Sequence, residues 1–177
     1  MQPCLTEVEF THLTLDCKRL PIGMLIDIIR FLPNLLFLEL SSWMDLDLQS
    51  LSFEDSEMLL LVSIASKITK VKVDQIQASE QLRLVMNLCP RMQYLEVRYT
   101  TDNDLEKMIG YIALNNDTRA FYLCHLCLCV NSFNEEIVRT LHEMIGFERL
   151  FWLESKTFRN YRIQHRDKKV FLDWDLS

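Results

Sequence analysis

Glycine and proline are scarce in this sequence, with three and four residues respectively among 177. Hairpin turns depend on these residues, so their scarcity argues against a β-sandwich or a β-barrel. The purest hydrophobic run, residues 58–65, is far shorter than the ~20 residues that a membrane helix needs. The first seven residues also lack the basic start and apolar run of a signal peptide. We therefore expect a cytoplasmic or nuclear protein with no membrane partner.

The sequence has fewer basic than acidic residues, with 19 Lys and Arg against 25 Asp and Glu, which gives a net charge of -6. This excess of negative charge opposes non-specific binding to nucleic acid, so no nucleic-acid partner is expected. The 49% hydrophobic content predicts a packed core, and the length suits a single domain over residues 1–177. In the cytosol or nucleus, the six cysteines are expected to be reduced thiols rather than disulfides.

Five short segments share one spacing of large apolar residues, apolar-x-x-apolar-x-apolar. The last two apolar positions alternate as they do in a strand with one buried face. The final positions, 15, 40, 73, 97 and 128, are separated by 25, 33, 24 and 31 residues, and a period of this size predicts a solenoid. The triplets are Phe10/Leu13/Leu15, Leu35/Leu38/Leu40, Ile68/Val71/Val73, Met92/Leu95/Val97 and Leu123/Leu126/Leu128.

Apolar residues at helical spacing lie between and after these segments, in stripes that begin near residues 22, 58, 82, 105 and 137. Short strands joined by long helical links are parallel, because each link must return the chain to the start of the sheet. The predicted fold class is therefore α/β. We expect a short right-handed horseshoe of about five parallel strands, each followed by a helix.

The end of the chain has a different pattern. Tyr161 and Ile163 alternate with polar residues, Val170 and Leu172 alternate again, and a polar stretch separates the two pairs. This pattern predicts a β-hairpin within residues 151–177, which we expect to cap the last strand edge of repeats spanning 8–150. Residues 41–52 are the expected loop or insertion behind the longest step of 33 residues.

One phrase occurs twice, as LPNLLFLEL at residues 32–40 and CPRMQYLEV at residues 89–97. Each closes a helix with a residue–proline pair, which disfavours further helix, and then enters a strand. This phrase resembles the leucine-rich repeats of F-box proteins. The resemblance implies a protein–protein interaction module that recognises substrates of a ubiquitin ligase. The F-box itself is not visible, so a ligase adaptor is expected as a partner only if an F-box precedes this chain.

The same family usually carries Asn or Cys just after each strand, where the side chain pairs with the backbone of the turns. Only Asn131 fits that pattern among the five corresponding positions, and the other four are Lys18, Trp43, Ile76 and Thr100. The polar ladder between turns is therefore expected to be weak.

The residues that flank the inward strand positions should face the open side of the sheet. They mix aromatic and charged side chains, as protein-binding surfaces often do, although an ordinary solvated face is the alternative. Some pairs, such as Glu39 and Lys72, are also explained as cross-strand neighbours. The predicted protein-binding residues of this concave face are His12, Phe37, Glu39, Lys70, Lys72, Tyr94, Glu96, Arg98, His125 and Cys127.

The sequence also suggests two other kinds of site, one for zinc and one for RNA. Cys124 and Cys127 have the spacing of a first zinc-ligand pair, but a second pair is missing, so neither a metal site nor a cofactor is predicted. Thiols that behave as small hydrophobic groups explain the cysteines better. The basic stretch at residues 156–169 is the remaining candidate for RNA, but a solvated hairpin is the favoured explanation, because the acidic chain as a whole opposes nucleic acid.

Catalysis has little support in the sequence, and no enzyme activity is predicted. Gly-x-Ser-x-Gly elbows, zinc-protease His spacings and glycine-rich phosphate loops are all missing. The alternative is a small α/β enzyme that uses Cys and His, for example Cys127 with His12. These two residues are expected at opposite ends of the repeat array, beyond hydrogen-bond reach.

Overall fold

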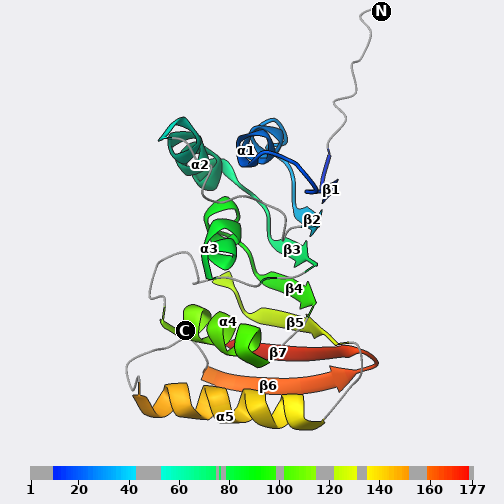
Figure 1. Ribbon diagram of the computed structural model, residues 1–177, viewed down its shortest axis with the longest axis vertical. Helices are drawn as coiled ribbons and strands as arrows, with labels where there is room; N and C mark the ends of the chain where they lie inside the picture. The colour runs from blue at the N-terminus through cyan, green and yellow to red at the C-terminus, as the bar shows by residue number, and fades with distance from the viewer. Residues whose placement is uncertain are drawn as a thin grey trace, which may run out of the picture.

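The computed structural model describes residues 10–42, 53–74, 76, 79–98, 102–114, 122–130, 135–151 and 159–175. Strands and helices alternate through most of the chain, and two strands end it (Figure 1). The elements are β1 (His12–Asp16), α1 (Ile22–Arg30), β2 (Phe37–Ser41), α2 (Phe53–Ala65), β3 (Lys70–Val73), α3 (Ser79–Leu88), β4 (Tyr94–Arg98), α4 (Asp102–Leu114), β5 (His125–Cys129), α5 (Glu135–Phe151), β6 (Arg159–Arg166) and β7 (Lys169–Asp175).

All seven strands form one open sheet in the order β1-β2-β3-β4-β5-β7-β6. The first five strands are parallel and lie in chain order, so the predicted parallel strands with helical links are confirmed. Their register is also the one that the triplets require, since Leu38 pairs with Val71, and Leu95 pairs with both Val71 and Leu126. The fold is therefore α/β with a mostly parallel sheet.

The same backbone contact joins each of the five parallel strands to the next. At the start of β2, β3, β4 and β5, two successive N–H groups donate to the carbonyl of the residue just before the preceding strand. The shared acceptors are the carbonyls of Thr11, Leu36, Thr69 and Gln93, at distances of 2.8 to 3.1 Å. This recurrence makes the five units structurally equivalent at their strand starts, despite the uneven lengths of chain between them.

The phrase that occurs twice in the sequence also makes the same turn twice. The N–H of Leu35 donates to the carbonyl of Leu32 at 3.1 Å, and the N–H of Met92 donates to the carbonyl of Cys89 at 3.0 Å. In both places the turn follows a helix and leads the chain into a strand. A similar local sequence therefore gives a similar local structure at two positions in the array.

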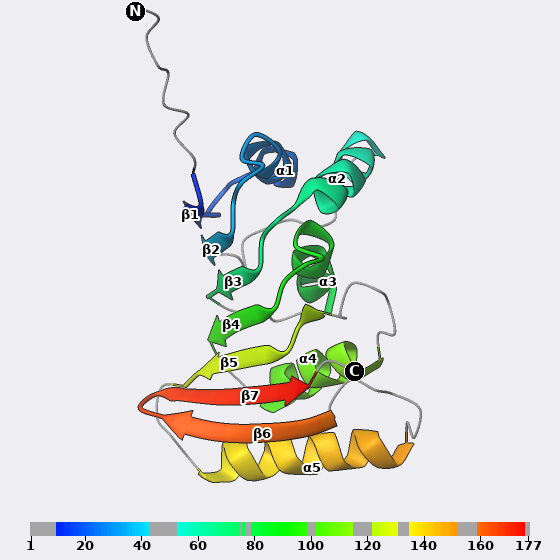
Figure 2. The same cartoon turned by 180° about the vertical axis from the view of Figure 1, so that it is seen from behind.

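The core lies between the sheet and a layer of helices. Helices α1 to α4 lie along one side of the sheet in chain order, and each helix contacts the next (Figures 1 and 2). The inward residues of β2 to β5 are buried there, whereas Leu13 and Leu15 of the edge strand β1 are only partly buried. The buried inward residues are Leu38, Leu40, Val71, Val73, Leu95, Val97, Leu126 and Leu128.

The predicted C-terminal hairpin is also confirmed. Strand β7 pairs antiparallel with β5, and β6 pairs antiparallel with β7 at the far side of the sheet. Helix α5 lies beside this hairpin, where a ring nitrogen of His142 is 3.0 Å from the Tyr161 hydroxyl. The hairpin thus covers the edge that β5 would otherwise expose. Most of the loop expected at residues 41–52 lies outside the described residues.

None of the helices in the described ranges combines the length and the apolar character needed to cross a membrane.

Candidate binding face of the sheet

The face of the sheet away from the helices carries side chains in three rows, because alternate residues of each strand point to the same side. All ten residues that the sequence predicts for a binding face lie in these rows. By register the rows are His12, Phe37, Lys70, Tyr94, His125, Asp173 and Arg162; then Thr14, Glu39, Lys72, Glu96, Cys127, Phe171 and Gln164; then Asp16, Ser41, Arg98, Cys129, Lys169 and Arg166.

Exposure varies along this face. The side chains of His12, Lys70, Arg98 and His125 are exposed, and most of the remaining predicted residues are partly exposed. Two positions depart from the expectation of an open face, since Glu96 is 8% exposed and Cys127 is completely buried. Neighbouring side chains from β4 and β7 crowd the face at this point. A partner could therefore touch most of the predicted residues, but not Cys127.

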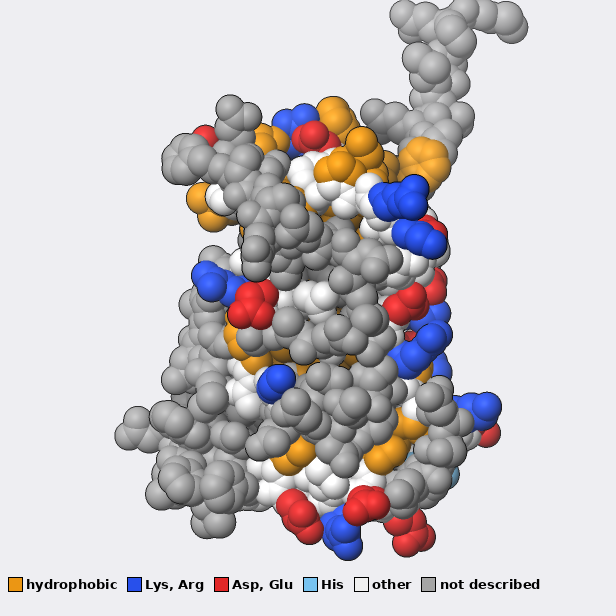
Figure 3. Space-filling model, in the orientation of Figure 1, with side chains coloured by type: hydrophobic (Ala, Val, Ile, Leu, Met, Phe, Trp, Pro, Cys, Tyr) orange, Lys and Arg blue, Asp and Glu red, His pale blue; other side chains and the backbone are white. Residues whose placement is uncertain are grey.

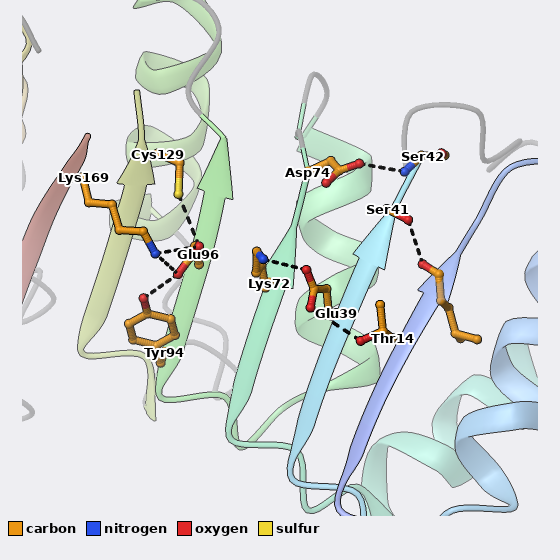
Figure 4. A network of polar contacts seen from close by, with 11 residues as sticks. Thr14, Glu39, Ser41, Ser42, Lys72, Asp74, Tyr94, Glu96, Cys129 and Lys169 are labelled. Atoms are coloured by element: carbon orange, nitrogen blue, oxygen red, sulfur yellow. Dashed lines mark hydrogen bonds and ion pairs between the residues drawn. The ribbon is translucent and has the colours of Figure 1, made fainter. Parts of the chain in front are cut away.

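Several charges on the face are paired with one another (Figure 4). Lys72 Nζ lies 2.6 Å from Glu39 Oε1, and the Thr14 hydroxyl donates to the other oxygen of Glu39 at 3.5 Å. The hydrogen bond to Glu39 raises the pKa of Lys72. The interpretation of Glu39 and Lys72 as cross-strand neighbours is thus confirmed. Among the described residues, Lys70 and Arg98 are exposed and have no ion-pair partner.

The Glu39–Lys72 ion pair is expected to contribute little to stability. The two side chains are 29% and 40% exposed, and partly exposed pairs typically contribute less than about 1 kcal/mol. A double-mutant cycle with Glu39→Gln, Lys72→Met and both together, followed by urea denaturation, measures the coupling directly. A coupling above about 2 kcal/mol, far beyond the usual range for such pairs, would contradict this expectation.

Glu96 is the centre of a second polar network on the same face. Lys169 Nζ lies 2.9 Å from both carboxylate oxygens, and the Tyr94 hydroxyl donates to Oε2 at 2.9 Å. The Cys129 thiol donates to Oε1 at 3.3 Å. Burial acts to raise the pKa of Glu96, but these three hydrogen bonds outweigh it and hold the pKa below its usual value. Glu96 is therefore a buried, charged and fully partnered carboxylate.

Two thiols adjoin this carboxylate. Cys127 Sγ, Cys129 Sγ and a Glu96 carboxylate oxygen all lie within 4.8 Å of one another, an arrangement of ligand atoms that could hold a metal ion. A hydrogen bond from Cys129 lowers the pKa of Cys127, whereas the same contact raises the pKa of Cys129. Cys124 and Cys127, which have the sequence spacing of a zinc-ligand pair, do not form this group of ligand atoms. The Cys124 thiol instead donates to the carbonyl of Gln93 at 3.7 Å.

The other cysteines in the described part of the chain fit the expected role of small hydrophobic groups. Cys17 and Cys89 are both completely buried in the core. Burial raises the pKa of Cys17 to about 11 and raises that of Cys89 further still. These two thiols are therefore protonated at neutral pH.

Aspartates at or just after the strand ends make hydrogen bonds to the backbone of the turns. The sequence analysis looked for Asn or Cys in this role and did not predict these aspartates. The carboxylate of Asp16 accepts the N–H of Lys18 at 3.0 Å, and that of Asp74 accepts the N–H of Ser42 at 2.9 Å. Hydrogen bonds with Ser42 and with the backbone of Lys18 lower the pKa of Asp16. The polar residue at the end of each of these strands was the only sequence signal for this role.

The histidines are not arranged for nucleophilic catalysis with the cysteine considered above. His12 lies in β1 and packs its ring against Phe37, whereas Cys127 lies in β5, with three strands between them. His125 contacts Asp173 at 2.8 Å on the neighbouring strand β7. The structure therefore keeps Cys127 and His12 far apart in the sheet. This separation agrees with the prediction from the sequence.

Comparison of this chain with protein-family models, with curated proteins and with solved structures finds no match.

Proposed function

We propose that this protein is a leucine-rich-repeat interaction module that binds a protein partner on the open face of its sheet. The observation that supports this most is the unbroken series of five parallel strands in chain order, joined at all four junctions by the same shared-carbonyl contact. Such a series is typical of solenoid repeats, in which each unit contacts only its neighbours. Within this proposal the array is a short horseshoe and the open face is its concave side.

The chemistry of the face favours a protein partner over a small molecule. Lys70 and Arg98 offer exposed positive charge, and partly exposed Phe37 and Tyr94 offer aromatic surface. Aromatic residues and arginine are enriched at protein interfaces. These exposed cations lie on β3 and β4 in the middle of the sheet, so an acidic segment of the partner is the expected contact there.

Exposed apolar side chains at the other end of the molecule also favour protein contacts. Figure 3 shows hydrophobic side chains gathered over α1 and α2, beside the start of β1. Large exposed apolar patches on a folded domain are one mark of a protein-interaction surface. The residues are Phe10, Met24, Phe31, Leu36, Leu60, Leu61 and Ile64, each between 44% and 72% exposed.

Charge reversal on the open face tests the binding role. We expect Lys70→Glu and Arg98→Glu to weaken capture of a partner by roughly tenfold or more each, because each reversal sets like charges against an acidic segment of the partner. Arg83→Glu on α3 and Lys107→Glu on α4 are matched controls, since both side chains are exposed but lie on helices. Quantitative affinity capture with the tagged full chain, compared across the four variants, is the measurement.

Two outcomes decide the proposal. A partner that the wild type and both helix variants retain, but that the two sheet variants lose, supports binding on the open face. Equal loss of partner capture in all four variants would contradict the proposal. So would the absence of any partner that binds the wild type stoichiometrically. Lys72 is a poorer test residue than Lys70, because its reversal would also set two negative charges side by side at Glu39.

The family resemblance extends the proposal to ubiquitin ligases. The repeated phrase at residues 32–40 and 89–97 and its repeated turn support a repeat of the F-box type, with the partner as the substrate to be modified. A ligase adaptor belongs to the assembly only through an F-box upstream of these repeats. Ubiquitination of the captured partner, lost with Lys70→Glu, is the expected result if the resemblance holds.

A further inference from the structure

Glu96, Cys127 and Cys129 bring two sulfur atoms and a carboxylate oxygen to one place on the open face. We propose that these three residues form a zinc-binding site with one coordination position left for water or another ligand. This inference goes beyond the interaction proposed above and does not depend on it, since Lys70 and Arg98, the residues that test partner binding, are not among the three ligands.

The ligands come together for a simple geometric reason. Cys127 and Cys129 are two residues apart on β5, so both thiols point to the same face. Glu96 pairs directly with Cys127 on the neighbouring strand β4. A tetrahedral zinc ion with Zn–S bonds of about 2.3 Å separates two sulfurs by ~3.8 Å. The three ligand atoms already lie within 4.8 Å of one another, and Cys129 Sγ is 3.3 Å from Glu96 Oε1.

The charges around the site balance when zinc is bound. Two thiolates and one carboxylate give three negative charges, zinc supplies two positive charges, and the ammonium of Lys169 supplies the third. Lys169 Nζ contacts both oxygens of Glu96 at 2.9 Å, so it can keep Oε2 while Oε1 turns to the metal. Each bound thiol releases its proton to solvent, because only the thiolate is a zinc ligand.

A supporting shell is also present. The Tyr94 hydroxyl donates to Glu96 Oε2 at 2.9 Å, which fixes the carboxylate with Oε1 toward the sulfur of Cys129 (Figure 4). Hydrogen bonds of this kind to a ligating carboxylate are usual around metal sites and tune their affinity. Cys127 is completely buried, whereas Cys129 is partly exposed and gives an ion access from solvent.

The donor set selects among metals. Mg²⁺ and Ca²⁺ prefer oxygen ligands throughout, so two sulfur donors exclude them. Cysteine thiolates favour zinc and other soft ions, and three protein ligands with one open position is the usual pattern of a zinc site that exchanges its fourth ligand. The chemical class of the ligand is therefore a thiophilic divalent ion, with zinc as the first candidate.

The first test is zinc binding by the reduced full chain after removal of metals with a chelator. Competition with a chromophoric chelator is expected to give one zinc per chain and no competition by Mg²⁺. Substitution with Co²⁺ should give thiolate-to-cobalt charge-transfer absorption and the strong visible bands of a tetrahedral site. Absence of stoichiometric zinc, or a cobalt spectrum without thiolate bands, would overturn the proposal.

Variants then identify the ligands. Cys129→Ser and Glu96→Gln are each expected to weaken zinc binding by at least roughly 10–100-fold. Mutation of a residue that only hydrogen-bonds to a metal ligand already lowers metal affinity by about that factor. Cys124→Ser is the matched control, because that thiol lies one residue before β5 and contacts Gln93 instead. Loss of binding in Cys124→Ser, or full binding in Cys129→Ser, would contradict the site.

Thermal melts in chelator show whether each variant folds, and zinc should raise the melting temperature of the wild type but not of Cys129→Ser. If Cys129→Ser does not fold, Glu96→Gln and the cobalt spectrum of the wild type decide the matter. Lys70→Glu leaves zinc affinity unchanged on this proposal, so failure of the partner-binding proposal and failure of the zinc site give different results.

Discussion

Leu95→Ala is expected to lower the free energy of unfolding by about 3–4 kcal/mol, the largest effect of a single substitution that we predict. Leu95 is completely buried at the middle of the sheet, where its neighbours in the same row are Val71 and Leu126. Truncation removes apolar contacts and leaves a cavity. Strand β4 cannot move to close this cavity, because β3 and β5 hold it on both sides. Urea denaturation followed by circular dichroism gives the value.

Leu60→Ala on α2 is the control for this substitution. Leu60 is 58% exposed, so the same chemical change is expected to alter the free energy of unfolding by no more than about 0.5 kcal/mol. If Leu95→Ala cost as little as Leu60→Ala, the inward row of the sheet would not be packed against the helices. The arrangement of strands and helices described above would then be untenable.

Lys169→Met is expected to destabilise the fold by about 2 kcal/mol. The substitution leaves Glu96, which is 8% exposed, without the ammonium that contacts both of its oxygens. Removing one partner of a fully buried ion pair typically costs about 3–5 kcal/mol, and the smaller figure reflects the 42% exposure of the Lys169 side chain. Measurement in chelator-containing buffer keeps any bound metal from compensating for the lost charge.

Two further variants isolate the origin of that effect. Lys168→Met removes the adjacent lysine, which lies exposed in the turn between β6 and β7, and is expected to change stability by less than about 0.5 kcal/mol. Combining Glu96→Gln with Lys169→Met should recover most of the loss, because no buried charge then lacks its partner. Equal effects of the two lysine substitutions would mean that the Glu96 contact contributes nothing.

Much of the fold could be predicted because apolar spacing determines which side chains must be buried. The triplets that contain Leu38, Val71 and Leu95 align in the sheet as their spacing requires. The helices fall where apolar stripes recur at helical spacing, and the alternation at Tyr161 and Val170 correctly indicated the terminal hairpin. These features are local, so a single sequence contains the information needed to find them.

The network around Glu96 could not be predicted in the same way. Alternation assigned Glu96 and Cys127 to the open face, but it does not say which residue of a distant strand lies opposite them. Lys169 reaches Glu96 from 73 residues away because β7 pairs antiparallel with β5 in one particular register. The tight turn at residues 167–168, where Asp167 adopts a left-handed backbone with φ of 54°, joins β6 to β7 and fixes only the register of that pair. No local pattern gives the register of β7 against β5, which places Lys169 opposite Cys129. Burial at Cys127 follows from those neighbours, and not from its own position in the sequence.

The agreement between chain order and spatial order has a consequence for how such a surface can change in evolution. Because β1 to β5 succeed one another in the sheet as they do in the chain, one strand with its helix is a module that can be duplicated or deleted without rethreading the remainder. Each duplication would widen the surface by one strand spacing of about 4.8 Å, from a present width of roughly 29 Å across the seven strands. The width of this face therefore changes in discrete steps.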